Sequence, residues 1–248
     1  MHIEYHRWWS HNLQREMEYK TYGHDGQALL AFPCQDGRYF DWENYHMIDV
    51  LAPFIEAGRL RVIAVDGIDW ETWTNHDFWD KRARIEHHES WFRYVTDELL
   101  PNVRHNPQQM FITTGASMGG FHAANFFFRR PDLFNGVLSL SGLYHASYGF
   151  GDYMDGLVYE NSPQDFLKNM PSDHYLMEMY RQRKIVFCVG QGRWEEPLLW
   201  STREMDRILT EKGVPHWFDY WGTDTDHDWP FWRKQIPYFV EKMLCWQI

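Results

Sequence analysis

A G-x-S-x-G motif at residues 115–119 constrains this chain more than any other feature. The apolar, β-branched run 111–114 before it is typical of a buried strand, and the Ala- and Phe-rich run after it indicates a helix. Strand, sharp turn and helix are the pattern of a nucleophile elbow, which holds a serine at the apex in strained backbone geometry. The flanking glycines let strand and helix cross closely, and the helix start adds free N–H groups and a positive dipole end. Ser117 is therefore the predicted nucleophile; an ordinary Gly-rich turn with a buried serine is the alternative.

The rest of the chain alternates between predicted strands and helices. An opening hairpin or meander is predicted in residues 1–32, and its last strand covers residues 28–32. Further strands are predicted at 61–65, 136–142, 184–190 and 217–221. Helices are predicted at 42–58, 86–103, 196–213 and 230–246, a loop at 70–83, and an insertion at about 144–183 with short helices near 163–168 and 174–181. This alternation predicts an α/β fold with a mostly parallel sheet covered on both faces. With 248 residues and neither linker nor repeat, we expect one domain over residues 1–248.

Composition excludes several classes of partner. The net charge is −11, and no basic run is interleaved with aromatics, which argues against nucleic acid and anionic membranes. No run of about 18 apolar residues could span a membrane. The three cysteines, Cys34, Cys188 and Cys245, are odd in number and far apart in sequence. We therefore expect reduced thiols, as in an intracellular protein, and no disulfide. Without a recognisable signal peptide, a cytoplasmic location is expected, and association into homo-oligomers is left open.

A serine nucleophile requires a histidine base later in the chain, and position selects one of the 14 histidines. His227 lies in the loop between the last predicted strand and the last helix, where an open α/β sheet places its site. The alternative is a surface histidine among acidic residues. A metal site formed with Asp224, Asp226 and Asp228 is disfavoured, because the later Glu and central Gly of a calcium loop are missing. Residues 87–89 lack the i, i+4 pair of a zinc helix, so no metal is expected.

The third member of a triad should follow the strand that ends at Gly190. Two adjacent carboxylates, Glu195 and Glu196, lie in this region, and either has the reach to orient an imidazole. Glu196, directly before Pro197 at a helix start, is the first choice, and Glu195 is the second. The alternative is that both merely favour a helix N-terminus.

Stabilisation of an oxyanion needs two backbone N–H groups. Met118, directly after the nucleophile, is expected to supply one. The loop after the 28–32 strand, around Cys34 and Gln35, is expected to supply the other.

Ten aromatic residues lie in predicted loops and in the insertion, and two interpretations of them are open. They either line a pocket over Ser117 or merely cover the sheet: Trp42, Tyr45, Trp70, Trp73, Phe78, Trp79, Tyr144, Tyr148, Phe150 and Tyr153.

The motif at residues 115–120, followed by R-P-D-L-F at 130–134, resembles the putative-esterase family of α/β-hydrolases. Relatives of this family include S-formylglutathione hydrolases, feruloyl esterases and enterochelin esterases. The similarity spans roughly residues 25–245 and includes S-L-S-G at 139–142, Glu196-Pro197, His227-Asp228-Trp229 and Trp232. It implies the α/β-hydrolase fold and a serine esterase that needs no metal or organic cofactor. Many members carry Asp soon after the glycine of the acid loop, whereas Arg193 and Trp194 intervene here.

We therefore expect a serine carboxylic-ester hydrolase that acts on a small-molecule ester through an acyl-enzyme. Ser117 would attack, His227 would transfer the proton, and Glu196 or Glu195 would orient the imidazole. An acyltransferase with the same residues is one alternative. The other is a non-catalytic hydrolase-fold protein that binds a carbohydrate or aromatic ligand.

Overall fold

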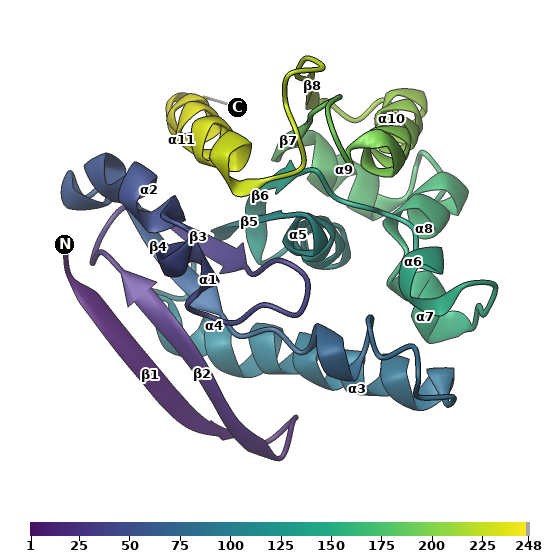
Figure 1. The fold of residues 1–248 in the computed structure, drawn as a ribbon, viewed down its shortest axis with the longest axis horizontal. Helices are drawn as coiled ribbons and strands as arrows, with labels where there is room; N and C mark the ends of the chain where they lie inside the picture. Colours follow the sequence, from purple (N-terminus) through teal and green to yellow (C-terminus); the bar gives the residue numbers. More distant parts are fainter. Residues whose placement is uncertain (247–248) are drawn as a thin grey trace.

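The computed structural model describes residues 1–246, and its strands form one eight-stranded sheet in the order β1-β2-β4-β3-β5-β6-β7-β8 (Figure 1). The strands are β1 (Ile3–Ser10), β2 (Arg15–Tyr22), β3 (Gln27–Phe32), β4 (Leu60–Val65), β5 (Phe111–Ala116), β6 (Phe134–Leu140), β7 (Lys184–Val189) and β8 (Trp217–Tyr220). The β1–β2 and β2–β4 pairs are antiparallel, and the other neighbouring pairs are parallel. The predicted mostly parallel α/β sheet is confirmed, and the opening hairpin is present as β1 and β2.

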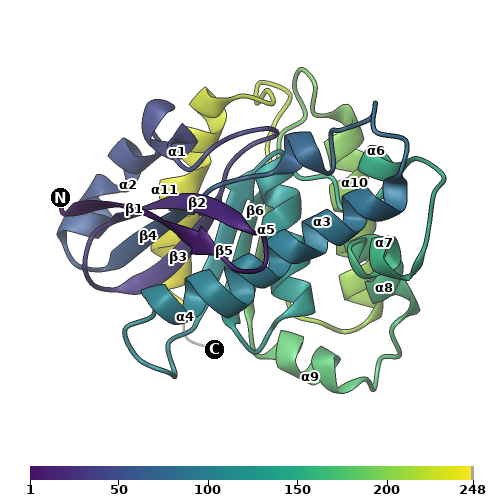
Figure 2. The ribbon, with the colours of Figure 1, turned by 90° about the horizontal axis from the view of Figure 1, so that it is seen from below.

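Helices cover both faces of this sheet (Figures 1 and 2). They are α1 (Asp41–Asn44), α2 (Met47–Glu56), α3 (Lys81–Arg93), α4 (Leu100–Val103), α5 (Met118–Arg129), α6 (Ser147–Phe150), α7 (Gly156–Glu160), α8 (Pro163–Asn169), α9 (Tyr175–Arg181), α10 (Glu196–Glu211) and α11 (Trp229–Cys245). One apolar cluster joins α2 and α11 to one face, and a second joins α3, α5 and α10 to the other. Because helices cover both faces, every residue of β4 and β5 is buried, and most of these residues are apolar.

Two long helices predicted from the sequence are interrupted in the structure. The predicted helix 42–58 is divided into α1 and α2 at His46, whose φ of 62° lies in the left-handed region. The predicted helix 86–103 begins earlier, at Lys81, because the Asp80 side chain accepts a hydrogen bond from the Ala83 N–H and caps it. The loop prediction for 70–83 is wrong over its last residues for this reason. A π-helical segment, Tyr94–Leu99, then separates α3 from α4.

The topology brings four loops to one edge of the sheet. Parallel strands end at the same edge, and the register pairs Ala116 with Leu140, Leu140 with Cys188, and Val189 with Tyr220. The loops that follow β5, β6, β7 and β8 therefore lie together, as expected for a site at the carboxyl ends of strands. Helices α6 to α9, which occupy the predicted insertion, precede β7. No helix within residues 1–246 combines the length and the hydropathy needed to cross a bilayer.

Candidate active site

Ser117 lies at the turn between β5 and α5 in a strained conformation, with φ of 57° and ψ of −124°. A non-glycine residue at positive φ costs free energy and is held there by its surroundings. Here the Ser117 N–H donates to the Leu140 carbonyl at 2.9 Å. The crossing leaves no room for side chains: a Cβ on Gly115 would lie 2.3 Å from the Gly119 carbonyl carbon. The turn therefore has the geometry that the sequence motif predicts.

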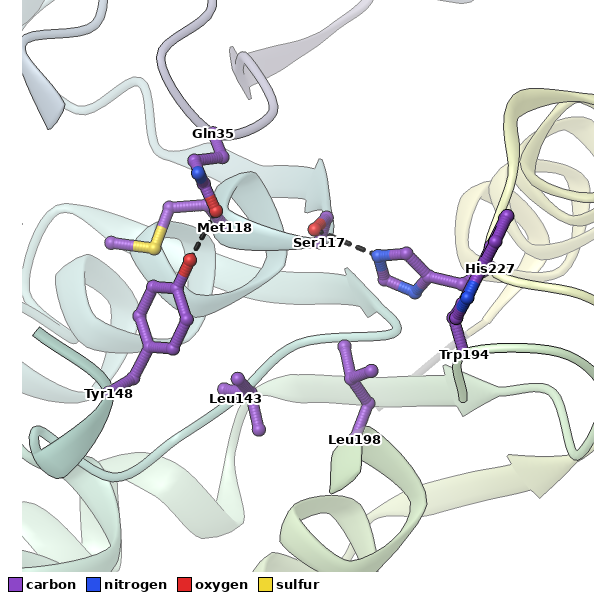
Figure 3. A pocket seen from close by; sticks show the side chains of 8 residues that line it. All are labelled: Gln35, Ser117, Met118, Leu143, Tyr148, Trp194, Leu198 and His227. Carbon is purple, nitrogen blue, oxygen red and sulfur yellow. Dashed lines mark hydrogen bonds between the residues drawn. The ribbon is translucent and has the colours of Figure 1, made fainter. Parts of the chain in front are cut away.

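A chain of hydrogen bonds connects Ser117 to a buried carboxylate. The Ser117 Oγ lies 2.9 Å from His227 Nε2 (Figure 3). On the other side of the ring, His227 Nδ1 lies 3.2 Å from Glu195 Oε2. His227 lies in the loop between β8 and α11, and its ring packs edge-on against Trp232, with centroids 4.9 Å apart. The three side chains come from three different strand ends, so the sheet register fixes their separation.

Glu195, not Glu196, is the carboxylate that contacts His227. Glu196 begins α10 with its side chain exposed, so the first choice made from the sequence is corrected. Trp194 has a φ of 64°, and this left-handed turn comes directly before Glu195, the residue that faces the interior. Glu195 is fully buried, and its Oε1 accepts hydrogen bonds from Ser141 Oγ at 2.6 Å and from the Gly190 N–H at 3.3 Å. These donors satisfy a carboxylate that would otherwise be costly to bury.

Glycines allow the acid loop to lie against the histidine loop. A Cβ on Gly190 would come within 2.2 Å of the Thr225 carbonyl oxygen, and one on Gly192 within 2.3 Å of Asp226 Oδ1. The His227 N–H donates to the Arg193 carbonyl at 3.0 Å, and the Arg193 N–H donates to Asp226 Oδ1 at 2.7 Å. The two loops thus form one hydrogen-bonded unit that carries both Glu195 and His227.

The residues expected to bind an oxyanion lie on the other side of Ser117. Met118 is the first residue of α5, so its N–H has no carbonyl partner within the helix. The loop after β3 lies against this helix end, because a Cβ on Gly119 would be 2.5 Å from the Pro33 carbonyl oxygen. In that loop the Cys34 thiol lies 3.4 Å from the Ala116 carbonyl oxygen, and the Gln35 Oε1 accepts a hydrogen bond from the Tyr148 hydroxyl (Figure 3).

A pocket of about 180 Å³ opens over Ser117 and is mostly apolar. Its lining comes from the elbow, the neighbouring loops, α6 and α10, and consists of Gln35, Ser117, Met118, Leu143, Tyr148, Trp194, Leu198 and His227 (Figure 3). Sites for drug-sized ligands measure about 300–1,000 Å³, so this pocket accepts only a small group.

Most of the aromatic residues singled out in the sequence do not line this pocket. Only Tyr148 does so. Trp42, Trp73, Tyr144 and Phe150 are buried in the core, Tyr153 is partly buried against a small apolar cluster, and Tyr45, Trp70, Phe78 and Trp79 are exposed elsewhere. Sequence reasoning assigned no role to Leu143, Leu198, Trp194 or Ser141. Ser141 was detectable as a serine directly after a strand and before a glycine, the same placement that marks a strand-end site.

The acidic residues around His227 have structural partners instead of a metal-like arrangement. Asp226 accepts from the Arg193 N–H, and Asp228 caps α11 by accepting from the Trp229 N–H at 2.7 Å. Within residues 1–246, no three His, Cys, Asp or Glu side chains converge as a metal site would require.

The family model described as "Putative esterase" matches residues 10–243 of this chain. Solved structures with a similar fold include a ferulic acid esterase, at 17% identity and a TM-score of 0.74, with 98% of each chain covered. An S-formylglutathione hydrolase from Staphylococcus aureus is 16% identical with a TM-score of 0.68, covering 98% of this chain and 97% of that one. The enterobactin esterase of Shigella flexneri is 18% identical with a TM-score of 0.65, covering 98% of this chain and 59% of that one. No curated protein matches the sequence. The likeness to these structures confirms the α/β-hydrolase fold.

Proposed function

The chain belongs to the esterase family described as "Putative esterase", and we propose that it hydrolyses carboxylic esters through a covalent acyl-enzyme on Ser117. The observation that carries this proposal is the hydrogen-bonded series from strained Ser117 through His227 to buried Glu195. A serine hydroxyl becomes a competent nucleophile when a neighbouring base accepts its proton, and this series supplies that base already oriented.

In the proposed mechanism, Ser117 Oγ attacks the ester carbonyl carbon while its proton moves to His227 Nε2. Glu195 accepts the hydrogen bond from His227 Nδ1–H and stabilises the imidazolium that forms. The carbonyl oxygen becomes an oxyanion, and we assign its hydrogen bonds to the Met118 N–H and to a backbone N–H of Cys34 or Gln35. The imidazolium then donates its proton to the leaving alcohol oxygen, and the acyl group stays on Ser117. Water, deprotonated by His227 Nε2, then attacks the acyl carbonyl carbon; the bond to Ser117 Oγ breaks, the imidazolium returns its proton to that oxygen, and the acid leaves.

No step of this mechanism calls for a metal or an organic cofactor, and the expected partner is a small-molecule ester. The small pocket favours a short acyl group. Cytoplasmic location remains a prediction of the sequence, and association into homo-oligomers remains open.

Labelling with a fluorophosphonate probe tests the proposed nucleophile. The wild-type protein should take up one probe per chain, and Ser117→Ala should take up none and lose ester turnover. Ser147→Ala is a matched control, because Ser147 is an exposed serine outside the hydrogen-bonded series, and it should label like the wild type.

The other candidate functions give different results in the same assay. Well-folded wild-type protein without labelling would replace the esterase proposal by a ligand-binding role. Labelled protein that forms new esters when alcohols are added, faster than it releases acid, would identify an acyltransferase.

A further inference from the structure

Trp194 is a large aromatic side chain that stands exposed at the rim of the pocket. It lines the pocket together with Ser117 and His227, yet 69% of its surface remains open to solvent. Its backbone is held at φ 64°, a conformation that is strained for a bulky residue. Trp194 belongs to none of the apolar clusters of the core, so an exposed indole on a strained turn beside Ser117 points to contact with a ligand.

The position of Trp194 relative to His227 identifies which part of an ester it would contact. In the proposed mechanism His227 Nε2 hands its proton to the departing oxygen, so the alcohol portion must leave on the imidazole side of Ser117. Trp194 belongs to the acid loop, which is hydrogen-bonded to the His227 loop through the Arg193 carbonyl. Gln35, Met118 and Tyr148, by contrast, lie on the opposite side of Ser117 (Figure 3). The indole therefore borders the path of the leaving alcohol.

The surroundings of the indole fit a ring that carries polar groups. The Arg193 guanidinium lies 5.3 Å from the Trp194 ring centroid, and the Asp226 carboxylate lies 3.8 Å from that guanidinium. The guanidinium thus lies over one face of the indole, and a ring that stacks on the other face can place its polar substituents near these charged groups. The pocket over Ser117, about 180 Å³, has no space for such a ring in addition to an acyl group.

We propose that Trp194 is a specificity-determining residue, the stacking platform for a ring-bearing leaving alcohol of an ester whose acyl group is short. This inference rests on the proposed esterase function and names the substrate class for the same site. The ring can be a sugar or an aromatic ring, since both present a flat apolar face to an indole.

Three acetate esters distinguish a ring-bearing alcohol from a linear one. Benzyl acetate and a mono-acetylated methyl pyranoside are compared with n-butyl acetate, using wild-type protein and the variants Trp194→Ala and Trp194→Phe. Trp194→Ala should raise KM for one or both ring esters about tenfold more than for n-butyl acetate, the size expected for one lost stacking contact. The change should appear in KM more than in kcat, because the ring is bound similarly in the ground and transition states. Trp194→Phe should restore most of the selectivity.

Trp200 provides the matched control. It is 64% exposed on α10, and the Arg203 guanidinium lies 5.8 Å from its ring, but it borders a neighbouring hollow and not the pocket over Ser117. Trp200→Ala should keep the ratio of ring to butyl esters at the wild-type value. Substitution at Trp194 could also move the adjacent Glu195, but such a shift would change the turnover of all three esters alike. It therefore cancels in the ratio of ring to butyl esters measured for each variant.

The possible results separate this inference from the function on which it rests. Equal effects of Trp194→Ala on all three esters, in a protein that labels and turns over, would overturn the platform alone. A loss of ring selectivity in Trp200→Ala and not in Trp194→Ala would also overturn it. Absence of both labelling and turnover in the wild type would overturn the esterase function and the platform together.

Discussion

At the scale of single residues, Glu195 and Glu196 are adjacent in sequence but occupy opposite environments. Glu195 is fully buried with three hydrogen-bond partners, whereas Glu196 is exposed at the start of α10. The same substitution at the two positions therefore compares a carboxylate that contacts His227 with one that does not.

Glu195→Gln should lower kcat by about 10³- to 10⁴-fold, because an amide can stabilise the wrong imidazole tautomer and does not stabilise an imidazolium. Glu196→Gln should change kcat by less than about twofold. Steady-state kinetics on a short-chain acetate, with circular dichroism to check folding, measures both. Similar losses in the two variants, or a larger loss at Glu196, would contradict the geometric assignment.

The sequence selected Ser117 and His227, which the structure brings within hydrogen-bond distance, but it did not select the glutamate that contacts His227. Both residues follow from the order of strands and loops, which hydrophobic patterning reveals. The direction of a carboxylate side chain depends on the left-handed turn at Trp194, and a tryptophan gives no sequence signal for positive φ. Apolar side chains that line the pocket, such as Leu143 and Leu198, could not be identified from the sequence either, because apolar residues are common in any protein core.

At the scale of elements, Arg129 links α5 to α3 and to the end of α7. Its two terminal nitrogens donate to Glu89 Oε1 and Oε2 at 2.8 and 2.9 Å, and one also donates to Asn161 Oδ1 at 2.7 Å. Its guanidinium also lies 3.7 Å from the ring centroid of Phe92. The neighbouring Arg130 pairs with the exposed Asp132 instead.

Arg129→Met should lower the free energy of unfolding by about 3 kcal/mol, because Glu89 would keep a largely buried charge without its partner. Arg130→Met should cost less than about 1 kcal/mol, as is usual for exposed ion pairs. Urea denaturation followed by tryptophan fluorescence gives both values. Equal destabilisation by the two substitutions would show that the Arg129 contacts add nothing beyond a surface pair.

The order and type of elements followed from the sequence, while the breaks within helices did not. Strand 111–114 and the helix after it were located closely, because their apolar runs are buried on all sides. The break at His46 and the π-helical segment Tyr94–Leu99 were missed. The break and the π-helical segment both leave the helical spacing of apolar residues nearly unchanged, so the hydrophobic periodicity of the sequence cannot reveal either of them.

At the scale of the whole molecule, a buried histidine makes stability depend on pH. Burial, and secondarily the neighbouring His122 and Arg129, hold the pKa of His88 well below its ordinary value. His88 Nδ1 accepts a hydrogen bond from Trp73 Nε1 at 3.0 Å, which requires the neutral ring. The unfolded chain, in contrast, exposes this imidazole and binds a proton below pH about 6.5.

The free energy of unfolding should therefore fall as the pH drops below about 6.5, by up to about 1.4 kcal/mol per pH unit from His88 alone. Above that pH both states are neutral at this position and the contribution is constant. His88→Gln should make the free energy of unfolding depend less on pH below about 6.5, although it lowers stability at pH 8. The matched substitution of an exposed histidine, His24→Gln, should leave the pH dependence unchanged. Urea titrations between pH 5 and 8 measure the slope; an unaltered slope in His88→Gln would contradict the assignment.

The separation of Ser117 from His227 by 110 positions has a consequence for biosynthesis. A ribosome adds about 5–20 residues per second, so Ser117 is made roughly 5–20 s before its base. During that interval β6, β7 and β8 are also absent or incomplete, and the Ser117 N–H lacks the Leu140 carbonyl that helps to hold the turn. On the proposed mechanism, a nascent chain thus carries an unactivated serine, and Ser117 becomes reactive only when β8 and α11 have packed onto the rest of the fold.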